Sequence, residues 1–504
     1  MTGITLDKQS ATPIYEQIAR QLREAMESGR LAGEARLPTT RALASRLRVN
    51  RLTVARAYEE LSREGRIAAH VGRGTFVAAG GAAGRRGPAA LPGTLSWAAL
   101  FARASDRAVQ AGGAPGRPPA RGAISFASVF PDPALFPVER FRSALDDVLR
   151  REGHRILAYG PPAGYPPLRE MIAAGLRTRG MGVSADQVVI TNGSQQGIDL
   201  VARALLDPGD CVLVENPTYT GAVQVFHSYG AEIAGVPVDS EGILVPQAEE
   251  AVERRRPKLV YVMPNFQNPT SGTMSLARRR AMVDLCAARR LPVLEDDFGG
   301  DLRFEGEDLP ALRAMPGGQD VIYLSTFAKK LLPGLRIGWL AAPREMAERL
   351  ERLKKITDYS TSLLLQAALH EFCRRGELDR HLAQVVQEYR RRRDAMLSAM
   401  KRCFPREVAW TRPLGGLVVW VTLPAGVDAD MVARDAESKG VLVGRGDLFH
   451  LEGGARGNLR LTFSQAGARD IHRGIRVLGD VIQKSIRQRR TGPRGRAAEP
   501  LPLI

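Results

Sequence analysis

Five short polar clusters in this 504-residue sequence contain the side chains that can do chemistry. Each cluster follows directly after an apolar run rich in β-branched residues, and the clusters span residues 192–196, 216–219, 264–269, 295–297 and 325–329. They combine amides, hydroxyls, carboxylates and a lysine, which are groups that bind and activate a small polar ligand. The chemistry of the individual residues indicates which ligand it is.

The first and last clusters carry groups that bind an anion. Gly193, Ser194 and Gln195 open a predicted helix, and the N-terminus of a helix attracts negative charge. Thr326 adds a hydroxyl to this set. Arg336 adds a guanidinium that can bind a phosphate through two parallel hydrogen bonds. Together these residues predict a phosphate site.

The remaining reactive side chains suit an aromatic aldehyde. Lys329 can form a Schiff base if it is partly desolvated, and Asp296 can keep a pyridine nitrogen protonated. Asn268 can donate to a ring hydroxyl, and Tyr219 offers an aromatic face for stacking. Phosphate, imine, pyridinium and phenolate together describe pyridoxal 5′-phosphate (PLP). Each residue alone has a commoner explanation, such as a solvated lysine or a core tyrosine, but their joint order favours a PLP site.

The elements that must position these residues are strands alternating with helices. The apolar runs VVIT, CVLVE, LVYVM, PVLEDD and VIYLSTF are separated by segments of helical length. Such alternation predicts a mostly parallel sheet covered by helices on both faces. Ligands of such sheets bind outside the carboxyl ends of the strands. We therefore expect the five clusters to form one site, with no metal in it.

Residues 124–480 resemble the fold-type I aminotransferases. The similar stretches are YGPPAGYPPLREMI, TNGSQQGIDL, ENPTY, PNFQNPTSGTMS, EDDFGG, STFAKKLLPGLRIGW and LRLTFS. The resemblance implies a large α/β domain with a smaller C-terminal subdomain. It makes Lys329 the PLP lysine, with Arg336 seven residues on binding phosphate, and this spacing disfavours the neighbouring Lys330.

The same resemblance implies roles for four further residues. Asp296 is the partner of the pyridine nitrogen, and Asn268 contacts the 3′-oxygen of the cofactor. Tyr159 reaches the phosphate of the cofactor in the neighbouring subunit, which implies a homodimer. Arg460, in LRLTFS, binds the α-carboxylate of an amino acid.

The first 78 residues predict three helices followed by two strands. Apolar stripes with helical spacing cover residues 14–26, 40–47 and 51–64, with Thr39 or Thr40 capping the second helix and Asn50 the third. The short turn before the third helix is typical of a helix-turn-helix. The sequence IAAHV-GRG-TFV predicts a β-hairpin, or wing.

The third predicted helix exposes the groups that read DNA. Arg51, Thr53 and Arg56 lie near its start, where side chains reach bases and phosphates in the major groove. Arg41 on the second helix flanks them. A helical bundle with solvated arginines is the alternative. Residues 12–78 resemble the GntR-type winged helix-turn-helix, a small α+β domain, and this implies DNA contacts at Arg41, Arg51, Thr53, Gly72 and Arg73.

Composition separates these two parts of the chain. The net charge is +18, from 72 basic and 54 acidic residues, yet the stretch from 124 to 480 contributes only +3. We expect a DNA-binding domain at 1–78, a flexible basic linker with one short helix at 79–122, an effector domain at 123–485 and a disordered basic tail at 486–504. The absence of an apolar run of eighteen residues, of a signal peptide and of paired cysteines indicates a cytoplasmic protein with no membrane segment.

The order of winged helix, linker and aminotransferase-like domain resembles the MocR subfamily of GntR regulators. That resemblance implies a PLP-dependent transcriptional regulator in which an amino acid or amine effector forms an external aldimine at Lys329. It implies an operator of double-stranded DNA with two half-sites, bound by a homodimer. Two positions depart from the MocR pattern: Phe298 replaces a tyrosine after EDD, and Ala328 replaces the serine before the PLP lysine.

Two other functions remain open. The first is a metabolic aminotransferase with an accessory N-terminal helical domain. The second is a DNA-binding protein whose large domain has lost its cofactor, and the loss of hydroxyls at Phe298 and Ala328 gives this hypothesis some support. The same losses argue against efficient transamination, so the sequence leaves enzymatic activity undecided.

Overall fold

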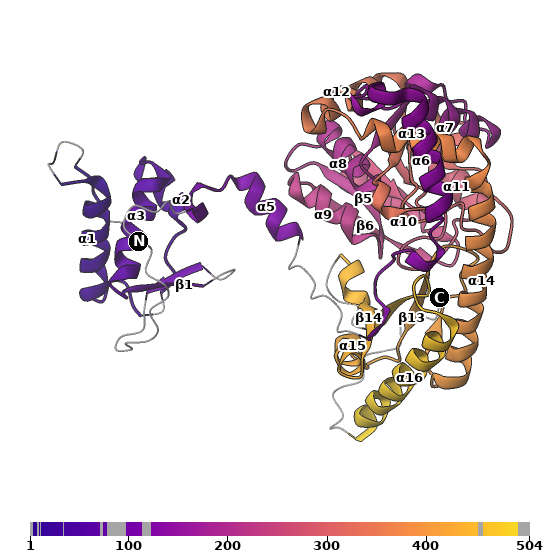
Figure 1. The fold of residues 1–504 in the computed structure, drawn as a ribbon. Coiled ribbons are helices and arrows are strands. Elements are labelled where there is room, and N and C mark those ends of the chain that lie inside the picture. Colours follow the sequence, from indigo (N-terminus) through magenta and orange to yellow (C-terminus); the bar gives the residue numbers. More distant parts are fainter. Residues whose placement is uncertain are drawn as a thin grey trace. The chain divides into compact units, whose positions relative to one another are not determined.

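The chain divides into two compact units, Met1–Asp106 and Arg107–Ile504 (Figure 1). The computed structural model describes residues 4–7, 10, 12–33, 35–70, 74–77, 97–112, 122–451 and 457–491. The division falls inside the predicted linker, because residues 97–106 pack with the small unit. None of the helices in these ranges combines the length and the apolar character needed to cross a bilayer.

The small unit has the predicted winged helix-turn-helix fold. It consists of α1 (Ile14–Glu27), α2 (Thr40–Leu47), α3 (Arg51–Arg63), β1 (Ile67–His70) and β2 (Gly74–Val77), with the two strands antiparallel. Thr39 and Asn50 cap α2 and α3, each accepting a hydrogen bond from a backbone N–H of the first turn. The apolar stripes form one core, and its fully buried members include Ile18, Leu22, Leu43, Val54 and Leu61.

Within the described part of the predicted linker, two helices lie where one was expected. They are α4 (Trp97–Leu100) and α5 (Arg103–Gly112), with a break at residues 101 and 102. The wing tip with Gly72 and Arg73 lies outside the described residues, so their predicted DNA contacts stay predictions.

The large unit is built on an eight-stranded mixed sheet that is mostly parallel, as predicted. Only β11 and β7 run antiparallel to their neighbours. The strand order is β4 (Val188–Thr191), β11 (Gly338–Ala341), β10 (Val321–Thr326), β9 (Val293–Asp296), β8 (Leu259–Val262), β5 (Cys211–Asn216), β6 (Glu232–Asp239) and β7 (Gly242–Ile243).

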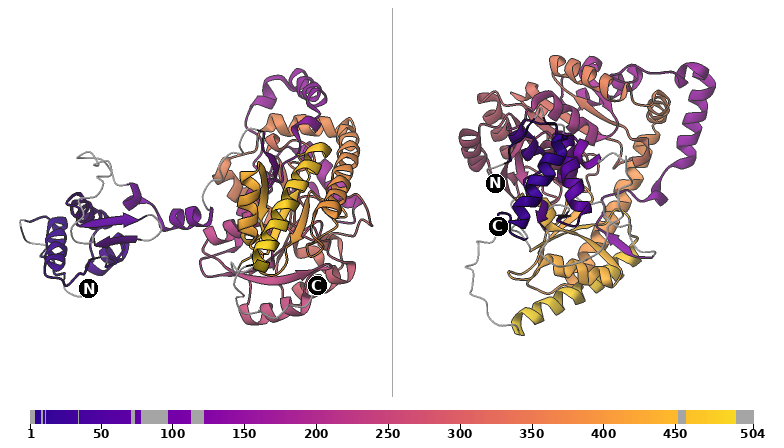
Figure 2. Two further views of the ribbon diagram at one scale, coloured as in Figure 1. Left: turned by 90° about the horizontal axis from the view of Figure 1, so that it is seen from below. Right: turned by 90° about the vertical axis from the view of Figure 1, so that its left-hand side faces the viewer.

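Helices cover both faces of this sheet (Figures 1 and 2). Successive strand residues point to opposite faces: Ile322 and Leu324 pack in the core on one face, and Tyr323 in the core on the other. The first face is covered by α8 (Ser194–Leu205), α9 (Thr220–Ser228) and α12 (Arg344–Asp358). The second is covered by α6 (Val138–Glu152), α7 (Pro166–Thr178), α10 (Val245–Arg255), α11 (Leu276–Ala288) and α13 (Leu363–Arg374).

A smaller C-terminal subdomain packs around a second sheet. Its strand order is β12 (Ala409–Trp410), β13 (Val418–Thr422), β15 (Asn458–Thr462), β14 (Val441–Arg445) and β3 (Ile124–Phe126). Its helices are α14 (Glu377–Cys403), α15 (Ala429–Ser438) and α16 (Ala468–Thr491), and α14 packs along α16. The strand β3 comes from the start of the unit, directly after the predicted linker.

The structure corrects the start of the predicted tail. α16 continues to Thr491, so residues 486–491 are helical and not disordered. The reason is that its apolar stripe continues: Ile482 and Ile486 are both buried in the subdomain core. The Arg489 guanidinium also packs against Gly426. Part of the basic charge that composition assigned to a tail therefore belongs to the folded domain.

Candidate functional site

The five polar clusters meet at one edge of the large sheet. They follow β4, β5, β8, β9 and β10, and these strands all run in the same direction. Their carboxyl ends therefore lie along one edge, as the alternation of strands and helices predicted.

Lys329 lies half-buried just after β10. Its Nζ donates a hydrogen bond to the Val129 carbonyl at 2.8 Å and lies 5.5 Å from the centre of the Phe130 ring. Burial is the main cause that lowers the pKa of Lys329 to about 8, and the positive charges of the nearby Arg460 and Arg336 contribute to this shift. A lysine with such a pKa is partly neutral near physiological pH, which a Schiff-base nucleophile requires.

Lys330, the alternative nucleophile, is held by other groups of the protein. It is buried, forms an ion pair with Asp301, and has its Nζ 4.8 Å from the centre of the Trp339 ring. A lysine held in this way would have to leave its carboxylate before it could act as a nucleophile. The structure therefore favours Lys329 as the reactive lysine.

Asp296, at the end of β9, is a buried carboxylate with one oxygen left over. Its Oδ2 accepts a hydrogen bond from the Tyr261 hydroxyl at 2.7 Å, whereas its buried Oδ1 has no hydrogen-bond partner among the described residues. Burial raises the pKa of Asp296 to about 7. A cationic N–H placed against Oδ1 would satisfy this oxygen and stabilise the charged form.

Arg336 lies against the turn before α8, where the anion site is predicted. Gly193 has a φ of 85° and precedes Ser194, the first residue of α8. Arg336 Nη2 donates to the Asn192 carbonyl at 3.1 Å, and a Cβ on Gly193 would lie only 2.7 Å from the same nitrogen. The glycine thus allows the guanidinium to lie against the turn, beside the N-terminus of the helix.

Two other predicted cofactor contacts are occupied by protein groups. The buried Thr326 hydroxyl donates to the Ile337 carbonyl at 3.2 Å, so it must rotate before it can donate to a phosphate. Gln195 accepts a hydrogen bond from the Tyr219 hydroxyl at 3.0 Å and donates to the Gly221 carbonyl at 2.7 Å. These hydrogen bonds of Gln195 hold the Tyr219 ring at the site.

Arg460, on β15, brings the small subdomain into the site. Its Nη1 donates to Asn268 Oδ1 at 3.0 Å, its Nη2 donates to the Ala127 carbonyl, and its guanidinium lies 4.6 Å from the centre of the Phe449 ring. Burial lowers the pKa of Arg460 to about 10. Its buried Nε has no hydrogen-bond partner among the described residues.

This set of residues fits PLP. Lys329, Arg336 and Arg460 place three basic side chains near the buried Asp296, and these basic groups suit a phosphate and a carboxylate. The orphaned Asp296 Oδ1 suits a pyridinium N–H. Phe298 packs against the apolar core, and Ala328 has no hydroxyl, so neither supplies the polar contact that is usual there.

Tyr159 lies at the surface of the large unit. It is 85% exposed, and its ring lies 5.1 Å from that of Tyr359, which is also exposed. This is the position expected of a residue that acts on a neighbouring subunit.

In the small unit, two predicted DNA contacts are engaged by the segment that follows the wing. Arg41 donates to the Phe101 carbonyl at 3.1 Å and forms an ion pair with Asp106 at 3.2 Å. Arg51 donates to the same carbonyl at 2.8 Å. Thr53 is half-buried on α3, and the exposed Arg56 lies over the Tyr15 ring at 4.0 Å.

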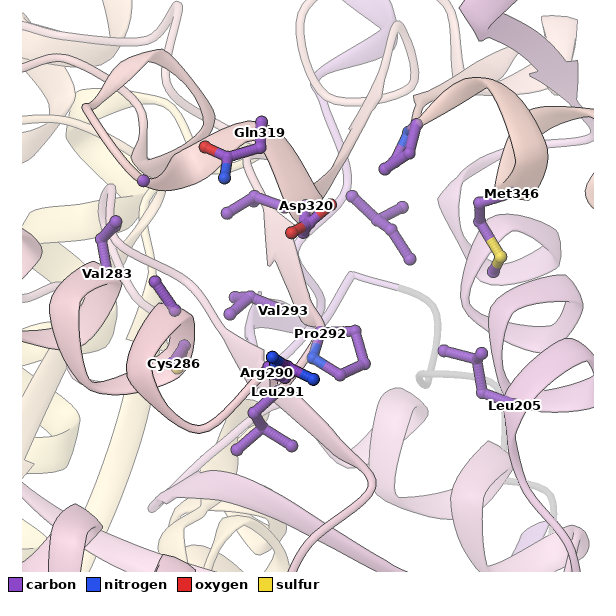
Figure 3. A pocket seen from close by; sticks show the side chains of 15 residues that line it. Leu205, Val283, Cys286, Arg290, Leu291, Pro292, Val293, Gln319, Asp320 and Met346 are labelled. Carbon is purple, nitrogen blue, oxygen red and sulfur yellow. The ribbon is translucent and has the colours of Figure 1, made fainter.

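A cavity of about 480 Å³ lies at the opposite edge of the large sheet (Figure 3). It is lined by Val293 and Val321, the first residues of β9 and β10, and by apolar side chains such as Leu205, Cys286 and Met346. It lacks the cluster of cations found at the carboxyl edge, so we place the cofactor at the carboxyl edge.

Comparison with known proteins assigns both units to families. Residues 14–77 match the bacterial regulatory proteins of the gntR family, and residues 127–478 match the aminotransferases of class I and II. The HTH-type transcriptional regulator YisV of Bacillus subtilis is 30% identical over 95% of this chain and 97% of its own length. The probable rhizopine catabolism regulatory protein MocR of Rhizobium meliloti is 30% identical over 87% of both chains.

The chain belongs to the MocR-type regulators. It is a PLP-dependent regulator in which a GntR-type DNA-binding domain is joined to an aminotransferase domain. Among solved structures, LysN, the α-aminoadipate aminotransferase of Thermus thermophilus, aligns with a TM-score of 0.72 and 36% identity over 78% of this chain and all of its own. That enzyme was crystallised with N-(5′-phosphopyridoxyl)-L-leucine.

Sequence reasoning missed some residues that shape the site. Tyr261 supports Asp296 from the neighbouring strand, and a lone tyrosine in the apolar run LVYVM was the only available signal. Lys354 and Asp358 form an ion pair that contacts the turn before α8, and Asp106 pairs with Arg41 in the small unit. The contacts of Asp358 and of Asp106 join segments that are distant in the sequence, so no local sequence pattern indicates them.

Proposed function

We propose that this chain is a transcriptional regulator that senses an amino acid or an amine through PLP. The carrying observation is that a winged helix-turn-helix and a site suited to PLP lie on one chain. We place the DNA-binding domain at residues 1–78 and the effector domain at residues 123–491, which includes the whole of α16. A protein with this role acts in the cytoplasm, where its DNA is.

The residues of the site divide the work of recognition. PLP, when bound, supplies an aldehyde that joins covalently to an amine. Arg336, Gly193 and Ser194 would hold its phosphate, and Asp296 would hold the proton on its ring nitrogen. Lys329 would supply the amine that an effector amine competes with, and Arg460 would bind the effector's carboxylate, with Asn268 keeping the guanidinium in place.

The segment at residues 124–130 provides a route from the effector to the DNA-binding domain. Its Val129 carbonyl accepts from Lys329, and its Ala127 carbonyl accepts from Arg460. An effector that engages both cations competes with both carbonyls. Because this segment directly follows the linker, its release changes the constraint on the linker. The affinity for DNA then changes to the extent that the effector binds the protein with the segment held and with the segment released differently.

A homodimer suits this role. The exposed Tyr159 is then placed to reach the phosphate in the neighbouring subunit. A dimer also presents two winged helices to an operator with two half-sites, as two-fold symmetric DNA-binding proteins do.

Replacing Lys329 with Ala tests the proposal in a reporter assay with full-length protein. The wild type should develop the visible absorbance of PLP held by the lysine, and its regulation should respond to an amino acid or amine. The Lys329→Ala variant should lose both properties while it keeps binding DNA. Regulation that still responds to the effector in this variant contradicts the proposal.

A metabolic aminotransferase is the second candidate, and the 36% identity with LysN favours it. Steady turnover of an amino donor with a 2-oxo acid, unaffected by removal of residues 1–78, would establish this function. The absence of hydroxyls at Phe298 and Ala328 opposes it.

A further inference from the structure

An ion pair with a buried lysine lies at the end of α12, next to the turn before α8 that is predicted to bind phosphate. Lys354 is completely buried, and its Nζ lies 2.7 and 2.9 Å from the two carboxylate oxygens of Asp358. Burial lowers the pKa of Lys354, while Asp358 opposes this effect. A buried ammonium needs such a partner, because an unpaired charge in the interior is strongly unfavourable.

Asp358 links this ion pair to the turn. Its Oδ2 accepts hydrogen bonds from the side-chain amide of Asn192 and from Gln196 Nε2, the latter at 2.8 Å. Gln196 in turn accepts from the backbone N–H of Asn192 at 2.7 Å. Asp358 therefore fixes Asn192 both directly and through Gln196.

Asn192 passes this constraint to the guanidinium that is predicted to bind phosphate. Its carbonyl accepts from Arg336 Nη2 at 3.1 Å, and the neighbouring Gly193 leaves no room for a Cβ beside that nitrogen. A shift of the turn therefore moves Arg336 as well as the first N–H groups of α8. Arg203 of α8 also donates to Thr357 of α12 at 2.9 Å, which ties the two helices together.

We propose that Asp358, held by Lys354, is a positioning residue for the phosphate of PLP. The proposal rests on the proposed function, because it presupposes that PLP binds at this site. Its role is confined to the phosphate. The groups that face the ring come from other strands: Asp296 ends β9, and Asn268 follows β8.

Titration of the full-length apoprotein with two ligands tests this role. PLP and pyridoxal, which lacks the phosphate, both react with Lys329 and are followed by the visible absorbance of the bound ligand. The Asp358→Asn variant keeps the shape of the side chain but loses its charge. We expect its PLP affinity to fall about tenfold, the lower end of what losing an outer-shell partner costs at metal sites. Its affinity for pyridoxal should not change.

A matched control breaks a similar ion pair elsewhere. Asp239 and Arg278 lie 2.7 Å apart with side chains 18% and 19% exposed, close to the 20% of Asp358. Asp239→Asn should leave the affinity for both ligands unchanged. If Asp358→Asn fails to fold, Gln196→Met replaces it, because this change removes the link between Asp358 and Asn192 that runs through Gln196 and leaves the ion pair intact.

The two ligands separate the outcomes. Loss of PLP affinity alone supports the positioning role. An equal loss for PLP and pyridoxal, or no loss for either, overturns it and leaves the ion pair a purely structural feature. A wild-type protein that binds no PLP overturns the proposed function together with this inference, whereas normal wild-type binding with an unaffected variant overturns only the inference.

Discussion

The amine of Lys329 should titrate far below an ordinary lysine. Burial and the charges of Arg460 and Arg336 lower its pKa from 10.5 to about 8. At pH 7, an amine with a pKa of 10.5 is about 0.03% neutral, and one with a pKa of 8 is about 9% neutral. The neutral, nucleophilic fraction is therefore roughly 300 times larger at Lys329.

Competitive labelling of the apoprotein with trace acetic anhydride measures this property. Acetylation of each lysine is followed by peptide mass spectrometry over a pH series, and the midpoint of the reaction reports the pKa of that amine. We expect a midpoint near pH 8 for Lys329, with the exposed Lys355 of α12 as a reference in the same sample.

Two variants separate the causes of the shift. Arg460→Leu removes a cationic neighbour, so the Lys329 midpoint should move to higher pH. The same change at Arg412, which pairs with Glu305, should leave the midpoint where it is. A wild-type midpoint close to 10.5, or a midpoint unmoved by Arg460→Leu, would refute the reasoning.

Three further predictions concern the cofactor, the DNA and the link between them. Because burial raises the pKa of Asp296 to about 7, its carboxylate protonates below that pH, so PLP affinity measured by titration should fall as the pH drops through 7. Asp296→Asn should bind PLP weakly and without this dependence; an unchanged pH profile in the variant contradicts the assignment. Asp106→Ala frees Arg41 from its ion pair and should tighten DNA binding about two- to fivefold in fluorescence anisotropy, the effect of losing a partly exposed pair. The exposed Glu59 offers a control of equal charge, and equal gains from Glu59→Ala would mean that only net charge matters. Hydrogen exchange at residues 124–130 should change when an effector is added to the PLP-loaded protein, and unchanged exchange there argues against this segment as the route.

The sequence sufficed where local patterns decide the structure. Apolar stripes and the caps at Thr39 and Asn50 predicted the helices of the small unit. Apolar runs followed by polar clusters predicted the parallel strands and the edge at which they end. The choice of Lys329 over Lys330 came from a family resemblance, and the structure adds a physical reason, because Lys330 is engaged in an ion pair with Asp301.

Tertiary contacts account for what could not be predicted. Lys354 and Asp358 have the i, i+4 spacing of a solvated ion pair, and it is the tertiary packing of α12, against α8 among other elements, that buries Lys354. The Thr326 hydroxyl faces a carbonyl of the adjoining segment, eleven residues away, rather than a ligand. The sequence predicts a tail at the end of α16 because this stretch is rich in arginine. The burial of Ile482 and Ile486, which extends the helix, depends on packing against the rest of the subdomain.

DNA affinity measured with and without effector is the most direct test of the central claim that one site on this chain senses an amine and controls DNA binding. The measurement uses PLP-loaded full-length protein, operator DNA, and an amino acid or amine that changes the absorbance of the bound cofactor. The account predicts that this ligand changes the affinity for DNA in the wild type and leaves it unchanged in Lys329→Ala. A ligand that alters the cofactor spectrum but leaves DNA affinity the same would contradict the account.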